Sequence, residues 1–76
     1  MNITITNEQA IAIAHQFADK EGWPWFDPIT VDAKRSFFGR ILQIVVRSNS
    51  NAIGCNVTVV LDPISGTIIR TGFKRI

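Results

Sequence analysis

The chain has 76 residues, of which 46% are apolar, and it carries a net charge of +2 with one cysteine and one histidine. This length supports one hydrophobic core, so we expect a single domain over residues 1–76. One cysteine excludes an intrachain disulfide and one histidine excludes a histidine-rich metal site. No apolar run approaches the roughly 20 residues that span a bilayer.

The charges are divided along the chain. Residues 1–33 hold one basic and five acidic residues, a net charge of −4. Residues 34–76 hold seven basic residues and one acidic residue, a net charge of +6. This division can steer an acidic partner toward the basic half. It can also reflect only a helix that carries acids and strands that carry bases.

The segment TNEQAIAIAHQFADKEG predicts one helix over residues 7–21. Thr6 suits the N-cap, and Gln9 stands at the capping-box spacing. Apolar residues recur at helical spacing, which indicates one apolar face. Gly22 is typical of the position just beyond a helix C-terminus.

The connection GWPWFDP follows the predicted helix and combines two prolines with three aromatic residues. Two interpretations of Trp23 and Trp25 remain open. The rings can cap one end of the core, or they can form a partly exposed anchor for another protein, because tryptophan is enriched in interface hot spots.

Four strands are predicted after this connection, at residues 29–37, 39–48, 55–62 and 67–74. The turn DPISG suits a type I turn with Gly66 in the left-handed region, and Asp62 can accept backbone N–H bonds within it. One helix followed by short-linked strands predicts an α+β fold, in which the N-terminal helix packs on a three- to four-stranded antiparallel meander sheet.

Alternation along the strands divides their side chains between two faces of the sheet. We expect the helix-facing set to be Leu42, Ile44, Val46, Val57, Val59, Leu61, Ile69, Thr71 and Phe73. We expect the outward set to be Ile41, Gln43, Val45, Arg47, Thr58, Val60, Ile68 and Arg70. Four branched aliphatic residues on a face that one helix cannot cover predict an interaction surface. Ordinary strand propensity, a homodimer and a foreign partner all remain open as explanations.

The sequence carries little that indicates catalysis. His15 falls on the polar side of the helix four residues before Asp19, which predicts a surface pair or a pH-sensitive contact with a partner. A catalytic pair needs Cys55 and His15 within hydrogen-bond reach of each other. We expect no such pair, because His15 is predicted on the outer side of the helix and Cys55 at the start of a strand in the sheet. The sequence has no phosphate loop, metal-ligand spacing or nucleophile elbow. We therefore expect no enzyme activity, no catalytic residue, no metal and no cofactor.

Nucleic acid is a second class of partner that the basic half permits. The bases of this half are Lys34, Arg35, Arg40, Arg47, Arg70, Lys74 and Arg75. A sheet that binds single strands presents aromatic rings to the bases, and the outward positions carry aliphatic residues instead. Only Phe37, Phe38 and Phe73 lie nearby, so nucleic acid is the less favoured partner.

The closing segment NVTVVLDPISGTIIRTG resembles the V-x-V-D-x-x-[ST]-G-x-[IV] hairpin of PepSY-like domains, with Val59 to Ile69 as the specific part. The layout of a helix followed by hairpins is similar to that of small immunity proteins of bacterial toxin systems. The resemblance implies a noncatalytic module that inhibits or chaperones another protein, such as a peptidase or a secreted toxin. PepSY-like domains are usually exported or membrane-attached, and the lack of a leader here favours the cytoplasmic, immunity-like version. No family catalytic residues carry over.

The sequence thus predicts a cytoplasmic inhibitor or immunity-type protein that occludes a protein partner, and no membrane partner. The predicted partner-binding residues are Ile41, Gln43, Val45, Arg47, Thr58, Val60 and Arg70, with Trp23 and Trp25 as candidate anchors. On this hypothesis Val45→Glu or Val60→Glu leaves the monomer folded. The alternatives are a nucleic-acid-binding domain that uses the basic half and a purely structural homodimer.

Overall fold

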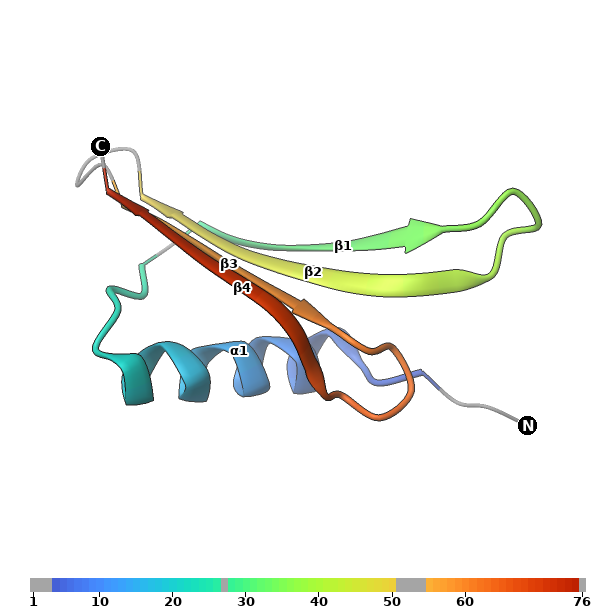
Figure 1. Ribbon diagram of the computed structural model, residues 1–76, viewed down its shortest axis with the longest axis horizontal. Coiled ribbons are helices and arrows are strands. Elements are labelled where there is room, and N and C mark those ends of the chain that lie inside the picture. The colour runs from blue at the N-terminus through green and yellow to red at the C-terminus, as the bar shows by residue number, and fades with distance from the viewer. Residues whose placement is uncertain (1–3, 27, 51–54, 76) are drawn as a thin grey trace.

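A computed structural model describes residues 4–26, 28–50 and 55–75. In these residues helix α1 (Asn7–Glu21) precedes strands β1 (Ile29–Arg35), β2 (Ile41–Ser50), β3 (Cys55–Leu61) and β4 (Ile68–Arg75). The strands form one antiparallel sheet in the order β1-β2-β3-β4, and α1 lies along one face of it (Figure 1). This arrangement confirms the predicted α+β meander.

Helix α1 begins and ends as its sequence predicts. The Thr6 hydroxyl accepts a hydrogen bond from the Gln9 N–H at 3.1 Å, and the Gln9 side-chain oxygen accepts one from the Thr6 N–H at 2.8 Å. This capping box satisfies two backbone donors that the first turn would otherwise leave free. At the other end Gly22 adopts a φ of 73°, the left-handed conformation that glycine allows without strain.

The core lies between α1 and the sheet. Its helix side consists of three alanines with no exposed surface, so the backbone of α1 can approach the strands closely. Its sheet side consists of larger branched residues. The buried cluster comprises Ala10, Ala14, Ala18, Ile44, Val46, Val57, Val59 and Leu61. The predicted inward orientation of the β3 residues and of two β2 residues is therefore confirmed.

A β-bulge changes the facing of side chains near the end of the β1–β2 hairpin. Lys34 pairs with Gln43, whereas the next residue, Arg35, pairs with Ile41, so Leu42 is an extra residue in β2. An extra residue moves the later side chains of that strand to the other face. Ile41 consequently packs against the core and Leu42 is 53% exposed. The predicted outward Ile41 and inward Leu42 are both wrong for this reason.

A second bulge has the same effect in the β3–β4 hairpin. Val60 pairs with Arg70 and Leu61 pairs with Ile68, which leaves Ile69 as the extra residue. Ile68 packs against the core and Ile69 is 52% exposed. The predicted orientations of these two isoleucines are therefore also reversed. Phe73, farther along β4, packs against the core as predicted.

The β3–β4 turn forms as its sequence predicts. The Asp62 carboxylate accepts hydrogen bonds from the backbone N–H groups of Ile64 and Ser65, both at 2.9 Å. These bonds, first that of Ser65 and then that of Ile64, hold the pKa of Asp62 below its ordinary value. Gly66 adopts a φ of 75° and donates its N–H to the Asp62 carbonyl at 3.0 Å.

Candidate binding surfaces

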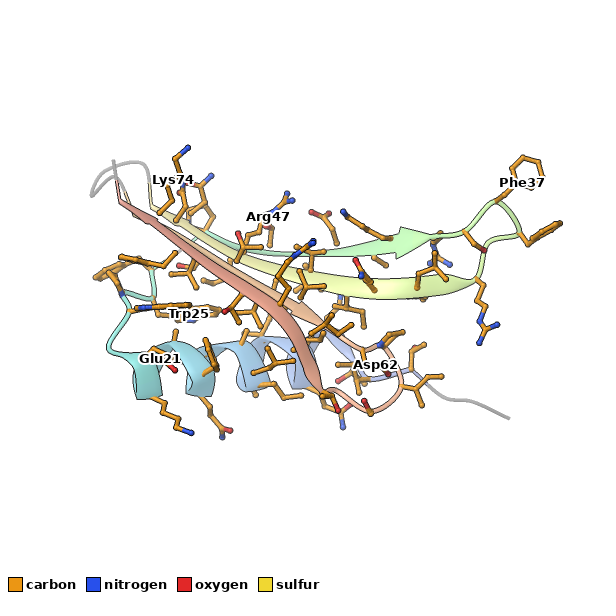
Figure 2. All side chains as sticks on the ribbon, viewed as in Figure 1. Glu21, Trp25, Phe37, Arg47, Asp62 and Lys74 are labelled. Atoms are coloured by element: carbon orange, nitrogen blue, oxygen red, sulfur yellow. The ribbon has the colours of Figure 1, made fainter. Side chains whose placement is uncertain are left out.

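The face of the sheet opposite α1 is called the open face here. The strand register assigns to it Thr30, Asp32, Lys34, Gln43, Val45, Arg47, Asn49, Asn56, Thr58, Val60, Arg70, Gly72 and Lys74. Figure 2 shows Arg47 and Lys74 pointing away from the helix on this side. The open face is the surface on which most of the predicted partner-binding residues lie.

Two valines at the centre of the open face are buried although no helix covers them. Val45 and Val60 are direct cross-strand partners, and each exposes only 2% of its surface. Asp32 pairs with Val45 on one side and Arg70 pairs with Val60 on the other, so four strands contribute one row. Long polar side chains can cover neighbouring apolar residues with the aliphatic part of the chain while the polar head stays in water.

The predicted exposure of four aliphatic residues on the open face is therefore wrong. Val45 and Val60 are sealed within the chain itself. Ile41 and Ile68 pack against the core on the helix side, because of the two bulges. The residues that the strand register assigns to the open face consequently offer charge and hydrogen-bonding groups to a partner. The half-exposed aliphatic residues Leu42 and Ile69 lie at the two bulges.

The charge of the open face is positive. Lys34, Arg47, Arg70 and Lys74 are all exposed there, and Asp32 is the one carboxylate among the described residues of this face. Asp32 lies 3.8 Å from the Arg47 guanidinium, and both side chains are more than half exposed. An exposed pair of this kind is weak, so it leaves the positive field of the face largely intact.

The opposite layer of the molecule has the opposite sign. Helix α1 exposes the acids Glu8, Asp19 and Glu21 against the single base Lys20. Much of the charge division along the sequence thus becomes a division in space. Figure 2 shows Glu21 on the helix, whereas Arg47 and Lys74 lie on the open face.

The two predicted tryptophan anchors lie on the helix side. Trp23 stacks on Phe73 at 5.4 Å between ring centroids and meets Phe17 edge-on at 5.4 Å. Trp25 stacks on His15 at 5.2 Å with an interplanar angle of 8°. Both tryptophans are half-buried against the core, as the core-cap interpretation expects. They cannot form one surface with the open-face residues, because the sheet separates them.

The titratable groups considered for chemistry are spread over the molecule. His15 lies 3.7 Å from the Asp19 carboxylate on the helix surface, which is the predicted surface pair. Asp27 and the side chains of Cys55 and Arg75 lie outside the described residues. Within the described ranges no three His, Cys, Asp or Glu side chains are grouped to hold a metal ion. Over the same ranges no helix has the length and apolar character needed to cross a bilayer.

The end of the β1–β2 hairpin is a surface that the sequence prediction did not single out. Phe37 is 97% exposed and Phe38 is 92% exposed, with the two rings perpendicular at 5.4 Å. Figure 1 shows this hairpin end projecting beyond the helix. The available sequence signal was the segment SFFG, which places two aromatic residues directly before a turn glycine between two strands.

A cleft of about 490 Å³ lies below this hairpin end. It is lined by Thr4, Arg35, Gly39, Arg40, Ile41 and Ile64, so its walls come from both hairpins and from the segment before α1. The Arg35 guanidinium donates to the Gly39 carbonyl at 3.1 Å. Sequence reasoning missed the cleft because it depends on how the two hairpins diverge.

Comparison with known proteins gives no match to a protein-family model, to a curated protein or to a solved structure. The resemblance to PepSY-like domains and immunity proteins accordingly stays a prediction.

Proposed function

We propose that this protein is a noncatalytic binding module that inhibits or regulates a protein partner by covering an acidic surface of that partner with its open face. The observation that carries the proposal is the set of four exposed cations, Lys34, Arg47, Arg70 and Lys74, on a face with one described carboxylate. Complementary charge speeds encounter and selects partners more than it adds affinity.

The architecture of the open face supports this role. Its cations extend from β1, β2 and β4 of one hydrogen-bonded sheet, so their backbone positions are set before a partner binds. The sealed pair Val45 and Val60 keeps the face from exposing an apolar patch that would favour nonspecific association. Thr58 and Gln43 stand beside the cations and supply hydrogen-bonding groups for orientation.

The test compares capture of partners from the native host by the wild type and by the double variant Arg70→Glu/Lys74→Glu. Both side chains are exposed, so the variant is expected to fold while its open face loses net positive charge. The proposal is supported if the double variant no longer captures a protein that the wild type captures, while the Lys20→Glu variant, changed on the helix layer, still captures it. Equal capture by wild type and double variant contradicts it. Sedimentation of the purified chain at several concentrations separates a homodimer from a foreign partner.

Nucleic acid is the second candidate, and one observation favours it. One open-face cation, Lys34, lies near the hairpin end, where Phe37 and Phe38 expose nearly all of their ring surface. Bases stack on such rings with about 1–3 kcal/mol each. A salt titration of binding to random oligonucleotides tests this alternative, because phosphate contacts give a steep dependence of log affinity on log salt concentration. If the partner is still captured after nuclease treatment, a protein partner is favoured over nucleic acid.

A further inference from the structure

The hairpin apex, defined as residues Ser36, Phe37, Phe38, Gly39 and Arg40, is the least buried apolar part of the described chain. Phe37 and Phe38 expose 97% and 92% of their surface, whereas Phe26 exposes 45% and the rings of Phe17 and Phe73 pack against the core. Scattered exposed apolar residues need no explanation, but two adjacent rings at a projecting tip are an interaction feature. Figure 2 shows Phe37 at the end of the molecule far from Trp25.

Hydrogen bonds within and beside the apex define its backbone turn. The Gly39 N–H donates to the Ser36 carbonyl at 2.9 Å, and the Arg40 N–H donates to the Ser36 hydroxyl at 3.2 Å. The Arg35 guanidinium bonds the Gly39 carbonyl across the turn. Both rings are therefore presented on an ordered turn, which lowers the entropy lost when they bind.

The charged residues next to the two rings in the sequence are all positive. Lys34, Arg35 and Arg40 flank the two rings, and residues 33–61 contain no aspartate or glutamate. The apex thus combines an apolar tip with a basic collar. Anionic lipid headgroups complement such a collar, and acyl chains complement the tip.

We propose that the hairpin apex inserts Phe37 and Phe38 into the interface of an anionic lipid bilayer while Lys34, Arg35 and Arg40 contact the headgroups. A lipid medium suits this shape better than a flat protein surface does. The rings are perpendicular to each other and exposed on nearly all sides, so a planar partner can cover only part of each. A bilayer surrounds an inserted tip and removes both rings from water.

This inference does not rest on the proposed role of the open face. It uses the two rings of the apex and their flanking cations, of which Lys34 alone is also one of the open-face cations. It revises the expectation of no membrane partner, which was based on the absence of a spanning segment. An interfacial tip requires no such segment. The two sites can be tested separately, because Arg70 and Lys74 lie on the open face and outside the apex.

The first test measures co-sedimentation of the purified chain with vesicles of phosphatidylcholine alone or mixed with phosphatidylglycerol. The wild type is expected to bind the anionic vesicles. Phe37→Ser/Phe38→Ser is expected to lower the partition coefficient by about 100-fold, because it removes two inserted rings. Arg40→Gln is expected to lower it about fivefold on anionic vesicles only. Phe26→Ser, which alters a half-exposed phenylalanine outside the apex, serves as the control and is expected to bind as the wild type does.

The second test reports insertion directly. In the Phe38→Trp variant, brominated acyl chains are expected to quench the fluorescence of the new indole. The fluorescence of Trp23 and Trp25, which pack against the core, is expected to stay unquenched. Failure of the wild type to bind any vesicle, equal binding by the double serine variant, or absence of quenching overturns the proposal. If the double serine variant instead loses a protein complex formed without lipid, the apex is a protein contact and the lipid inference is wrong.

Discussion

The Ser48 hydroxyl holds both backbone groups of Phe26. It accepts a hydrogen bond from the Phe26 N–H at 2.9 Å and donates one to the Phe26 carbonyl at 2.7 Å. Ser48 is only 2% exposed, so water cannot replace it in either bond. This pair fixes the connection between α1 and β1 to the inner strand β2, and it thereby sets where the aromatic cap meets the core.

Replacing Ser48 by alanine is expected to lower the free energy of unfolding by about 2 kcal/mol, because the N–H and carbonyl of Phe26 lose their partner together. Urea denaturation followed by circular dichroism measures this change. Ser65→Ala, at an exposed turn position, is the control and is expected to cost less. A Ser48→Ala variant as stable as the wild type would show that the two Phe26 groups find other partners.

Val60→Glu is expected to unfold the domain. A carboxylate at a position that is 2% exposed must lose its hydration, which costs several kcal/mol, and small domains have only about 5 kcal/mol in total. Val60→Ala is expected to cost about 2 kcal/mol through lost burial. Arg70→Glu places the same charge on the exposed cross-strand neighbour and is expected to fold. If the Val60→Glu variant folds, the side chain at position 60 can reach solvent, and Val60 is again a candidate partner-binding residue.

Gly66→Ala is expected to destabilise the protein more than Gly22→Ala does. The two glycines have nearly the same φ, 75° and 73°, so the backbone strain of about 1–2 kcal/mol is matched. A Cβ at Gly66 would meet Ile13 Cδ1 at 2.9 Å, whereas a Cβ at Gly22 meets nothing within 4 Å. Thermal or urea unfolding of both variants measures the difference, to which displacement of the Ile13 side chain by the new Cβ contributes.

Ile13→Val tests this explanation of Gly66 because it deletes the clashing Cδ1 atom. In a double-mutant cycle, Gly66→Ala is expected to cost less in the Ile13→Val background than in the wild type. Equal costs in both backgrounds would mean that the clash is relieved in some other way.

Asp62 is expected to make part of the stability depend on pH in the acid range. Because its folded-state pKa lies below the unfolded-state value, its contribution is complete above the unfolded-state pKa and is lost as the pH falls through the folded-state pKa. Asp62→Asn keeps an acceptor oxygen for the turn but does not titrate there. The difference in unfolding free energy between wild type and variant should therefore shrink as the pH is lowered. A difference that is constant over this range would contradict the assignment.

Local patterns in the sequence were sufficient for the elements and their order. The capping box of Thr6 and Gln9, the left-handed Gly22 and the Asp62 turn involve residues close together in the chain, so their chemistry can be recognised without tertiary contacts. The same holds for the inward set of β3, whose alternation is uninterrupted. These features also placed most of the candidate partner-binding residues on one face.

The candidate surface itself was predicted less well, for a physical reason that Ile41 and Ile68 illustrate. Each lies just beyond a bulge, and a bulge follows from how two strands twist against each other rather than from either strand alone. A strict alternation therefore assigned both isoleucines to the wrong face. The burial of Val60 was missed for a related reason, since its cross-strand neighbours Val45 and Arg70 are known only once the strands are paired.

By itself the sequence determined one amphipathic helix, four strands, their antiparallel succession and the separation of acidic from basic residues, because each is encoded in local periodicity and composition. Only the tertiary structure decided that the open face is cationic with a sealed valine pair and that Phe37 and Phe38 project into solvent. Those outcomes depend on strand register and on the limited reach of a 15-residue helix over the longer β1–β2 hairpin. Both outcomes depend on how the strands pair with one another, and no single segment of the sequence contains that information.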